Sequence, residues 1–463
     1  MELQLRISGF HHEVLKQHLL PADGKEAVAV ALCGRYSDDE SEILLVHDLT
    51  LIPHDECYCR EPDLLHWSTE KIQHYFERIG KTDFALLKIH SHPGGYDKFS
   101  RTDDISDNEF FDSAFGWAMN DKPHSSAVML PDGKIFGRFF FNDLHHEPID
   151  KILIAGDTIQ QFVNRGKISK ADFALRTIQA FGERTYQSLS ELTVGVVGCS
   201  GTGSPVIEQL VRLGIGKLVL VDPDTVERKN LNRILNTTNA DAKKGKPKVL
   251  ALADAIKKIG LGTVVDARQV NLYDDVETLK ALIKCDVVFG CMDSVDGRHL
   301  LNQLSSFYLL PYFDLGVKLE ANGFGGIDKI CGSVHYLQPC KSSLITRGVY
   351  TTEDLRASSQ YRKNPEEFEN LRKEAYIKNI NVNNPAVISV NMQIASHAVN
   401  EFLNRIHPFK TEHPSSYAAS TIDITEGYMV NSAESDFEQD NYLKKKSGRG
   451  DMLPFIEMSE LVS

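Results

Sequence analysis

The sequence lacks the features that would place the chain in or across a membrane. No run of about eighteen apolar residues occurs in its 463 residues, and a transmembrane helix needs a run of that length. The first residues, MELQLRISGFHHEV, contain neither the basic stretch nor the apolar core of a signal peptide. We therefore expect a cytoplasmic protein with no membrane segment.

Paired cysteines and excess positive charge are also missing. The eight cysteines include no C-x-x-C pair, with Cys57 and Cys59 the closest, which suits reduced thiols and gives no structural zinc cluster. Lys and Arg number 51 against 64 Asp and Glu, so the net charge of -13 disfavours broad affinity for nucleic acid or anionic membrane. The chain is 42% hydrophobic and 25% charged, as in soluble globular proteins, and its length predicts two or three domains.

A glycine turn between two apolar runs is the strongest local pattern. Residues 194–197 are apolar and lead into Gly198, Gly201 and Gly203. A segment of helical periodicity and a second apolar run ending in Asp222 follow, as in a βαβ unit that binds a nucleotide. Ser200 stands where the dinucleotide fingerprint has its second glycine. A strand, turn and helix without a ligand is the alternative interpretation.

Polar residues downstream of the turn favour ATP over a dinucleotide. Asp222 and Asp224 are followed by Asn230 and Arg233, then by Lys248 and later by Asp293. These side chains supply cations for a triphosphate and an acid for its Mg²⁺.

The same ordered set resembles the ThiF/MoeB and ubiquitin-activating enzyme superfamily. The resemblance implies a Rossmann-like doubly wound α/β domain over residues 173–431 that adenylates the C-terminal glycine of a ubiquitin-like or sulfur-carrier protein. It implies that Asp222 holds the ribose, that Asn230, Arg233 and Lys248 hold phosphates, and that Asp293 places magnesium. Arg176 matches an arginine that reaches the ATP of the partner subunit in a homodimer; a solvated helix charge is the alternative.

The cysteines depart from this family. Many members carry C-x-x-C zinc ligands and a thioester-forming cysteine, and this chain has no such pair. Cys340 is the better nucleophile candidate because Lys341 could favour its thiolate. The alternative is a thiol without a role and direct transfer of the acyl group to a separate acceptor, such as a conjugating enzyme.

The N-terminal half contains a candidate metal site in KIHSHPGGYDKFSRTDD. His90 and His92 lie at the end of a predicted strand, where alternation points them to one face, and Asp103 follows at a helix start. Two imidazoles and a carboxylate could share a zinc ion whose fourth position is left to water, with Glu26 as general base. Ser100 and Asp103 also form a helix capping box, and an isolated H-x-H is often a surface pair.

The whole constellation resembles the JAMM (JAB/MPN) metallopeptidase motif. It is matched by Glu26, His90, Ser91, His92, Pro93, Ser100 and Asp103. The resemblance implies an α+β, cytidine-deaminase-like domain over residues 1–145 in which His90, His92 and Asp103 bind zinc. It further implies that Glu26 activates water and that Ser100 stabilises the oxyanion. Glu40 and Glu42 lie near Glu26 and are alternatives for the base.

Periodicity supplies the remaining elements. A connecting helix is expected over Ile149–Val163 within a linker at 146–172, and a mobile helical insertion near the adenylation site over 350–380. A helix is expected from Asn384-Pro385 to about 406 and a strand within 415–431. A C-terminal tail at 432–463 is expected to be inert or to carry a docking segment at Met452–Leu461. In the N-terminal half, strands are expected at 27–34, 42–46, 85–89, 126–130 and 134–141, and helices at 68–80 and 103–118.

These patterns together predict a bifunctional enzyme that uses zinc, ATP and magnesium. One half would adenylate the carrier's terminal glycine, and the other would trim carrier precursors or cut conjugates. As the resemblance implies, such fusions occur in bacterial conjugation-like operons, some linked to phage defence. Carrier activation for thiocarboxylate formation in cofactor, cysteine or siderophore synthesis is an alternative, as is a non-catalytic scaffold that binds a ubiquitin-like partner.

Overall fold

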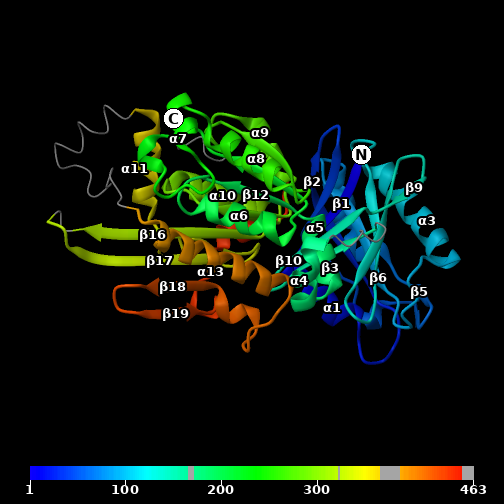
Figure 1. The fold of residues 1–463 in the computed structure, drawn as a ribbon. Coiled ribbons are helices and arrows are strands. Elements are labelled where there is room, and N and C mark those ends of the chain that lie inside the picture. Colours follow the sequence, from blue (N-terminus) through cyan, green and yellow to red (C-terminus); the bar gives the residue numbers. More distant parts are fainter. Residues whose placement is uncertain (165–171, 322–323, 365–385, 451–463) are drawn as a thin grey trace. The chain divides into compact units, whose positions relative to one another are not determined.

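The chain forms two compact units, each with its own β-sheet (Figure 1). The computed structural model describes residues 1–164, 172–321, 324–364 and 386–450. Unit 1 comprises Met1–Gly166, Ser306–Leu309 and Tyr442–Glu457, and unit 2 comprises Lys167–Ser305, Leu310–Asn441 and Met458–Ser463. Within the described part, no helix is both long and apolar enough to cross a membrane.

Unit 1 is built on a nine-stranded mixed sheet in the order β11-β10-β1-β3-β2-β6-β7-β8-β9. A short hairpin, β4-β5, stands apart from it. The elements are β1 (Glu2–Ser8), α1 (Gly9–Leu19), β2 (Val28–Ser37), β3 (Ser41–Leu51), η1 (His54–Glu56), β4 (Cys59–Glu61), β5 (Leu64–His66), η2 (Thr69–Ile72), α2 (Gln73–Ile79), β6 (Ala85–Ser91), α3 (Arg101–Trp117), β7 (His124–Met129), β8 (Ile135–Phe140), β9 (His146–Pro148), β10 (Lys151–Ala155) and β11 (Ile159–Val163).

Alternation along the central strands gives this sheet two buried faces. On β2, Val28, Val30 and Leu32 belong to the core formed with α2 and α3, whereas Ala29 and Ala31 belong to the core formed with α1. Helices therefore cover both faces, and the strands read as continuous apolar runs.

The predicted strands and helices of residues 27–141 are confirmed, whereas the connecting helix over Ile149–Val163 is wrong. Residues 151–155 form β10, which pairs parallel with β1, and 159–163 form β11, which pairs antiparallel with β10. An apolar run this short cannot be assigned to helix or strand by periodicity, and Gly156-Asp157 supplies the turn that divides it. Strand β1 and helix α1 were not predicted from the sequence.

The expected C-terminal tail is ordered up to Gly450. Residues Asn441–Lys446 form α14, and Gly448 O accepts a hydrogen bond of 3.2 Å from Gly34 N in β2. His47 Nδ1 lies 2.7 Å from Ser447 O. The end of the chain up to Gly450 is thus part of unit 1 and not a free tail, while Met452–Leu461 lies outside the described residues.

Unit 2 has an eight-stranded sheet in the order β14-β13-β12-β15-β16-β17-β18-β19. The first five strands are parallel and the remaining pairs antiparallel. The elements are η3 (Asp172–Ala174), α4 (Leu175–Phe181), α5 (Glu183–Glu191), β12 (Thr193–Val197), α6 (Gly203–Leu213), β13 (Lys217–Val221), η4 (Arg228–Asn230), α7 (Asn239–Lys244), α8 (Lys248–Ile259), β14 (Val264–Arg268), α9 (Val276–Ile283), β15 (Val287–Gly290), α10 (Val295–Phe307), β16 (Tyr312–Ala321), β17 (Ile327–Leu337), α11 (Thr352–Lys363), α13 (Ile388–Ile406), η5 (Pro414–Tyr417), β18 (Ala419–Asp423), β19 (Tyr428–Ser432) and η6 (Glu434–Asp436).

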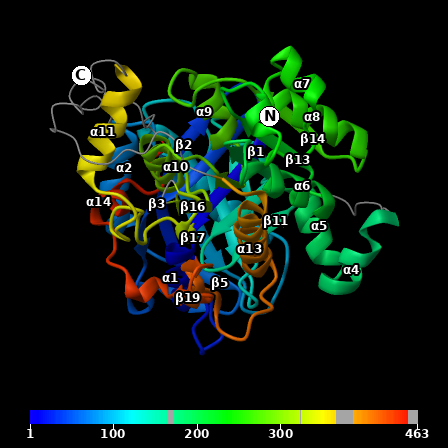
Figure 2. The ribbon, with the colours of Figure 1, turned by 60° about the vertical axis from the view of Figure 1, so that its left-hand side comes forward.

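The C-terminal part of unit 2 matches the expected pattern in outline. Helix α13 lies along β16 and β17 and also packs on α6 (Figures 1 and 2). It begins at Ile388; Asn384-Pro385, its predicted start, lies outside the described residues, as does the end of the predicted insertion. Two strands, β18 and β19, form a hairpin where one strand was predicted.

Candidate functional site

Three predicted metal ligands converge in unit 1. His90 Nε2 lies 3.0 Å from Asp103 Oδ1, His92 Nε2 lies 3.3 Å from Asp103 Oδ2, and the two Nε2 atoms are 3.2 Å apart. All three side chains are buried, and they form the one cluster of metal-ligand type found among the described residues.

Two local features of the sequence bring these donors together. Leu86 of β6 belongs to the core shared with α2 and α3, so alternation places His90 on that same face of the sheet. Helix α3 begins with a capping box in which Ser100 Oγ accepts from Asp103 N at 3.1 Å and Asp103 Oδ2 accepts from Ser100 N at 2.6 Å. The cap therefore fixes the carboxylate of Asp103 at the end of the helix that faces β6.

The donor set fits a tetrahedral zinc ion. Ligands at about 2.0–2.1 Å in tetrahedral geometry lie about 3.3 Å from one another. The two imidazole Nε2 atoms are 3.2 Å apart, and each lies within 3.3 Å of one oxygen of Asp103. His92 Nδ1 lies 2.7 Å from Tyr96 O, so a proton on Nδ1 would be donated to that carbonyl and Nε2 would keep its lone pair for the metal. Burial alone would raise the pKa of Asp103, but the hydrogen bonds from His90 and His92 hold it well below its usual range.

Glu26 brings a further carboxylate to this cluster. Its Oε1 lies 4.0 Å from His92 Nε2, and burial raises the pKa of Glu26 to about 7, against the opposing charge of His92. The alternative acid Glu42 is buried elsewhere, in an ion pair with Arg35 and a 2.6 Å hydrogen bond from Ser37. The geometry therefore favours Glu26 over Glu42 as the base.

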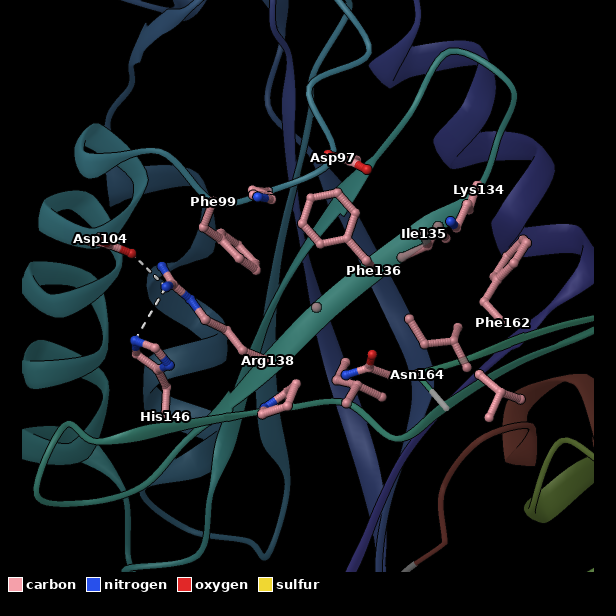
Figure 3. A pocket seen from close by; sticks show the side chains of 16 residues that line it. Asp97, Phe99, Asp104, Lys134, Ile135, Phe136, Arg138, His146, Phe162 and Asn164 are labelled. Atoms are coloured by element: carbon pink, nitrogen blue, oxygen red, sulfur yellow. Dashed lines mark hydrogen bonds and ion pairs between the residues drawn. The ribbon is translucent and has the colours of Figure 1, made fainter. Parts of the chain in front are cut away.

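Figure 3 shows a cavity of about 620 Å³ in unit 1, whose lining does not include the three metal-ligand candidates. Its wall includes Phe99 and Phe136, whose ring centroids are 5.3 Å apart, and the Phe136 ring lies 6.4 Å from that of His92. Arg138, also in the wall, donates to Asp104 at 2.6 Å and contacts His146 at 3.4 Å. The cavity thus has both aromatic and charged residues in its wall, and Phe136 is the wall residue that contacts His92.

The second site is a cavity of about 690 Å³ in unit 2, at the carboxyl ends of β12, β13 and β15. The predicted residues that line it are Gly198, Asp222, Asp224, Asn230, Arg233, Lys248 and Asp293. Ligands of open parallel sheets bind at this edge, where the strand order reverses. The structure thus brings together residues that are up to 95 positions apart in the sequence.

The glycine turn positions the wall of this cavity. Gly198 has φ 92°, and a Cβ there would lie 2.5 Å from Cys291 O. A Cβ on Gly203 would lie 1.8 Å from Gly198 O, so only glycine allows this approach of the helix to the turn. Gly201 packs on Asn391 of α13 instead of lining the cavity, and Ser200 lines it.

Asp222 is a preformed acceptor site. Its Oδ2 accepts from Cys199 N at 2.7 Å and its Oδ1 from Asp224 N at 2.9 Å, while Lys248 Nζ lies 3.4 Å from Oδ1 and 2.6 Å from Asp224 Oδ2. Burial raises the pKa of Asp222, and Lys248 opposes this change. Asp293 reaches solvent within the cavity, although the surrounding protein still raises its pKa.

Two predicted residues lie away from this cavity. Arg176 is exposed on α4, where it donates to Gln179 at 3.2 Å. Cys340 is only 4% exposed, in the turn after β17, and has φ 67°. Neither lines the cavity of its own chain.

Part of the cavity wall comes from the 350–380 segment, which was predicted to lie near the adenylation site but without any named site residue. Ser358, Tyr361 and Arg362 of α11 line the cavity, as do Tyr273 and Asp296. The first three follow the i, i+3, i+4 spacing of one helix face, which was a usable signal, but the charged composition of that segment suggested a mobile insertion.

Comparison with known proteins identifies the class and then the family. The parallel strands, the glycine turn and the acidic and basic residues of unit 2 define a Rossmann-like adenylation domain. The model of the ThiF family matches residues 174–433, more than half of the chain, and the chain therefore belongs to the ThiF family.

Curated relatives share this region. Ubiquitin-like modifier-activating enzyme 5 of Caenorhabditis elegans is 30% identical over 168 residues, covering 34% of this chain and 38% of that protein. The enzyme of the same name from Dictyostelium discoideum is 33% identical over 129 residues, covering 26% and 33%. The matched region is thus less than two fifths of either relative. A crystal structure of E. coli MccB with ATP is 17% identical, covers 59% of this chain and 74% of that chain, and has a TM-score of 0.43.

Proposed function

We propose that unit 2 adenylates the C-terminal glycine of a ubiquitin-like or sulfur-carrier protein, using ATP and Mg²⁺. The observation that carries this proposal is the convergence of Asp222, Lys248 and Asp293 on one cavity beside the glycine turn. Family membership and the names of the curated relatives support the same reaction. We expect a homodimer in which Arg176 reaches the partner's nucleotide.

The chemistry follows from the charges of the cavity. The phosphates of ATP repel the carboxylate of the carrier until cations neutralise their negative charge. Lys248 and Arg233 supply the positive charge, and Asn230 supplies a further hydrogen bond. Asp222 accepts from the ribose hydroxyls. The carboxylate oxygen then bonds to the α-phosphorus, the bond from that phosphorus to the bridging oxygen breaks, and pyrophosphate leaves. Mg²⁺, held by Asp293, would neutralise the departing phosphates.

Carrier-dependent exchange between pyrophosphate and ATP tests this reaction. Lys248→Ala and Asp293→Ala should each lower the exchange rate about a hundredfold or more, because each removes charge that stabilises the transition state. Arg212→Ala is the matched control, since Arg212 is exposed and paired with Glu208 on α6. No exchange by the unaltered chain with any glycine-terminated carrier would refute the proposal.

We further propose that unit 1 is a zinc metallopeptidase that cuts at the C-terminus of the same carrier, either trimming a precursor or releasing a conjugate. The single observation behind it is that His90, His92 and Asp103 meet within reach of Glu26. Zinc held by those three ligands would supply Lewis-acid polarisation of a carbonyl and of water. Glu26, whose Oε1 lies 4.0 Å from His92 Nε2, can accept a proton from water and return it to the leaving amine.

Metal removal and one substitution test the peptidase. The chain should hold close to one zinc per chain, and chelation should abolish cleavage of a carrier extended beyond its glycine. Glu26→Gln should keep the zinc and lose about a hundredfold or more in cleavage rate, because the base is gone while the ligands remain. Glu13→Gln, an exposed residue of α1, should match the unaltered chain. Full cleavage by the zinc-free protein would refute the proposal.

The two reactions suit one polypeptide, because a peptidase product with a free glycine is the substrate of adenylation. We propose a cytoplasmic role in a bacterial ubiquitin-like conjugation pathway. A pathway of phage defence is one such role. The burial of Cys340 favours direct handover of the acyl group, which also fits thiocarboxylate formation on a sulfur carrier. A trapped protein conjugate would favour conjugation; a carrier mass gain matching sulfur in place of oxygen would favour the second pathway.

A further inference from the structure

Helix α11 brings an arginine to the nucleotide cavity that belongs to none of the sequence motifs. Arg362 lines the cavity together with Ser358 and Tyr361 of the same helix. Helix α11 begins more than fifty residues after Asp293 in the sequence. Its residues nevertheless form one wall of the cavity that Asp293 also lines.

A network of contacts fixes the guanidinium of Arg362. Its Nε donates to Asp296 Oδ2 at 2.8 Å, and its central carbon lies 3.8 Å from the centroid of the Tyr273 ring. Ser358 Oγ donates to Asp296 Oδ1 at 3.0 Å, and Tyr273 Oη donates to Asp296 O at 2.6 Å. The carboxylate of Asp296 is 4% exposed, so it holds Arg362 from a buried position. A planar cation stacked and hydrogen-bonded in this way loses little further freedom on binding an anion.

The network leaves the terminal nitrogens of the Arg362 guanidinium available to bind an anion. Among the residues that the structure describes, only Asp296 accepts a hydrogen bond from Arg362, and it does so from Nε. The terminal nitrogens of a guanidinium are the pair that grips a phosphate. Lys248 and Lys229, by contrast, are already paired with Asp224 and Glu227.

The position of Asp296 indicates which part of a nucleotide this arginine meets. Asp296 lies in the first turn of α10, three residues after Asp293, at a helix N-terminus whose dipole attracts anions. We propose that Arg362 binds the triphosphate tail of ATP and that Asp296 and Tyr273 are positioning residues that aim it. This inference rests on the proposed adenylation and adds a fourth phosphate-binding side chain, from α11, to Asn230, Arg233 and Lys248.

Calorimetric binding of Mg-ATP, AMP and adenosine to the full chain tests the assignment without any carrier. Arg362→Ala should raise the Kd for ATP about tenfold or more, while the Kd values for AMP and adenosine change less than about twofold. Arg362→Lys should recover part of the loss because it keeps the charge without the planar fork. Arg356→Ala, on an exposed position of α11, is the matched control and should leave all three affinities unchanged.

Kinetic measurements show whether Arg362 binds ATP directly or only stabilises the fold around the cavity. In pyrophosphate exchange, measured at a temperature where every variant is folded, Arg362→Ala and Asp296→Asn should raise the KM for ATP with the KM for the carrier unchanged. If the unaltered chain binds ATP and Arg362→Ala binds it equally well, only this inference fails. Equal weakening of ATP and adenosine would also overturn it, since the contact would then be to the nucleoside. Failure of the unaltered chain to bind ATP would refute the adenylation proposal itself, and this inference with it.

Discussion

Lys88 Nζ lies 2.8 Å from Asp107 Oδ1 in an ion pair that is almost completely buried. Asp107 also accepts from Arg138 at 2.7 Å, so one carboxylate joins β6, α3 and β8. Because its removal takes the buried carboxylate away from two buried cations, Asp107→Asn should lower the free energy of unfolding by about 3–5 kcal/mol. Chemical denaturation of the zinc-free chain measures this loss.

Asp104→Asn is the control for that experiment. Asp104 contacts the same Arg138 at 2.6 Å, but its side chain is 49% exposed, and an exposed ion pair is worth less than about 1 kcal/mol. A loss as large for Asp104 as for Asp107 would mean that burial does not decide the strength of these pairs.

The same carboxylate gives unit 1 an acid-sensitive stability. Burial by itself would raise the pKa of Asp107, but Lys88 and Arg138 lower it below its usual value. Folded Asp107 therefore stays ionised at a pH where the unfolded chain, with a pKa of about 3.9, binds a proton. The stability it contributes is fully present above that pH and is lost as the pH falls further. The difference in unfolding free energy between the unaltered chain and Asp107→Asn should accordingly shrink from pH 6 to about pH 3, and a constant difference would contradict the assignment.

Much of both sites could be predicted from the sequence, because motif residues fixed by spacing are positioned by local structure. His90 is placed by strand alternation at the end of β6, with His92 just beyond that strand, and Asp103 is placed by its capping box. The role of Asp107 could not be foreseen, since its partner Arg138 lies on β8, and pairing between distant strands leaves no local pattern. Arg362 was not predicted for a different reason: the helical spacing of α11 is visible in the sequence, but its charged composition does not show which face meets the cavity.

Ser100 has two proposed roles that substitutions can separate. Its hydroxyl oxygen caps α3 by accepting from Asp103 N, while its O–H could donate to an oxyanion in the metal site. Ser100→Ala should cost about 1 kcal/mol of stability and about a hundredfold in cleavage rate, whereas Ser100→Thr, which keeps both functions, should retain most of each. Denaturation curves and cleavage assays on one preparation measure both effects. A loss of stability without a loss of rate would leave Ser100 as a cap only.

Phe136, which lines the cavity of unit 1 and contacts His92, tests whether the peptide substrate binds in that cavity. Because its ring forms an apolar wall of the cavity in Figure 3, Phe136→Ala should raise the KM for a peptide substrate about tenfold with zinc content unchanged. Phe10→Ala, a partly exposed residue of α1, should leave KM unaltered. An unchanged KM for Phe136→Ala would place the substrate on another side of the metal cluster.

Cys340 is the last of the proposed catalytic residues to be tested. Its surroundings predict that replacing it leaves the activity unchanged. The residue is 4% exposed, its backbone oxygen accepts from Gln439 Nε2 at 2.6 Å, and it does not line the nucleotide cavity. A thiol that receives an acyl group must reach the adenylate, so a buried Cys340 could do so only after this turn opens. We therefore expect Cys340→Ser to preserve pyrophosphate exchange and transfer of the carrier to its acceptor. A carrier adduct that reducing agent releases, present in the unaltered chain and absent in Cys340→Ser, would instead show that the turn opens during the reaction and that Cys340 is the nucleophile.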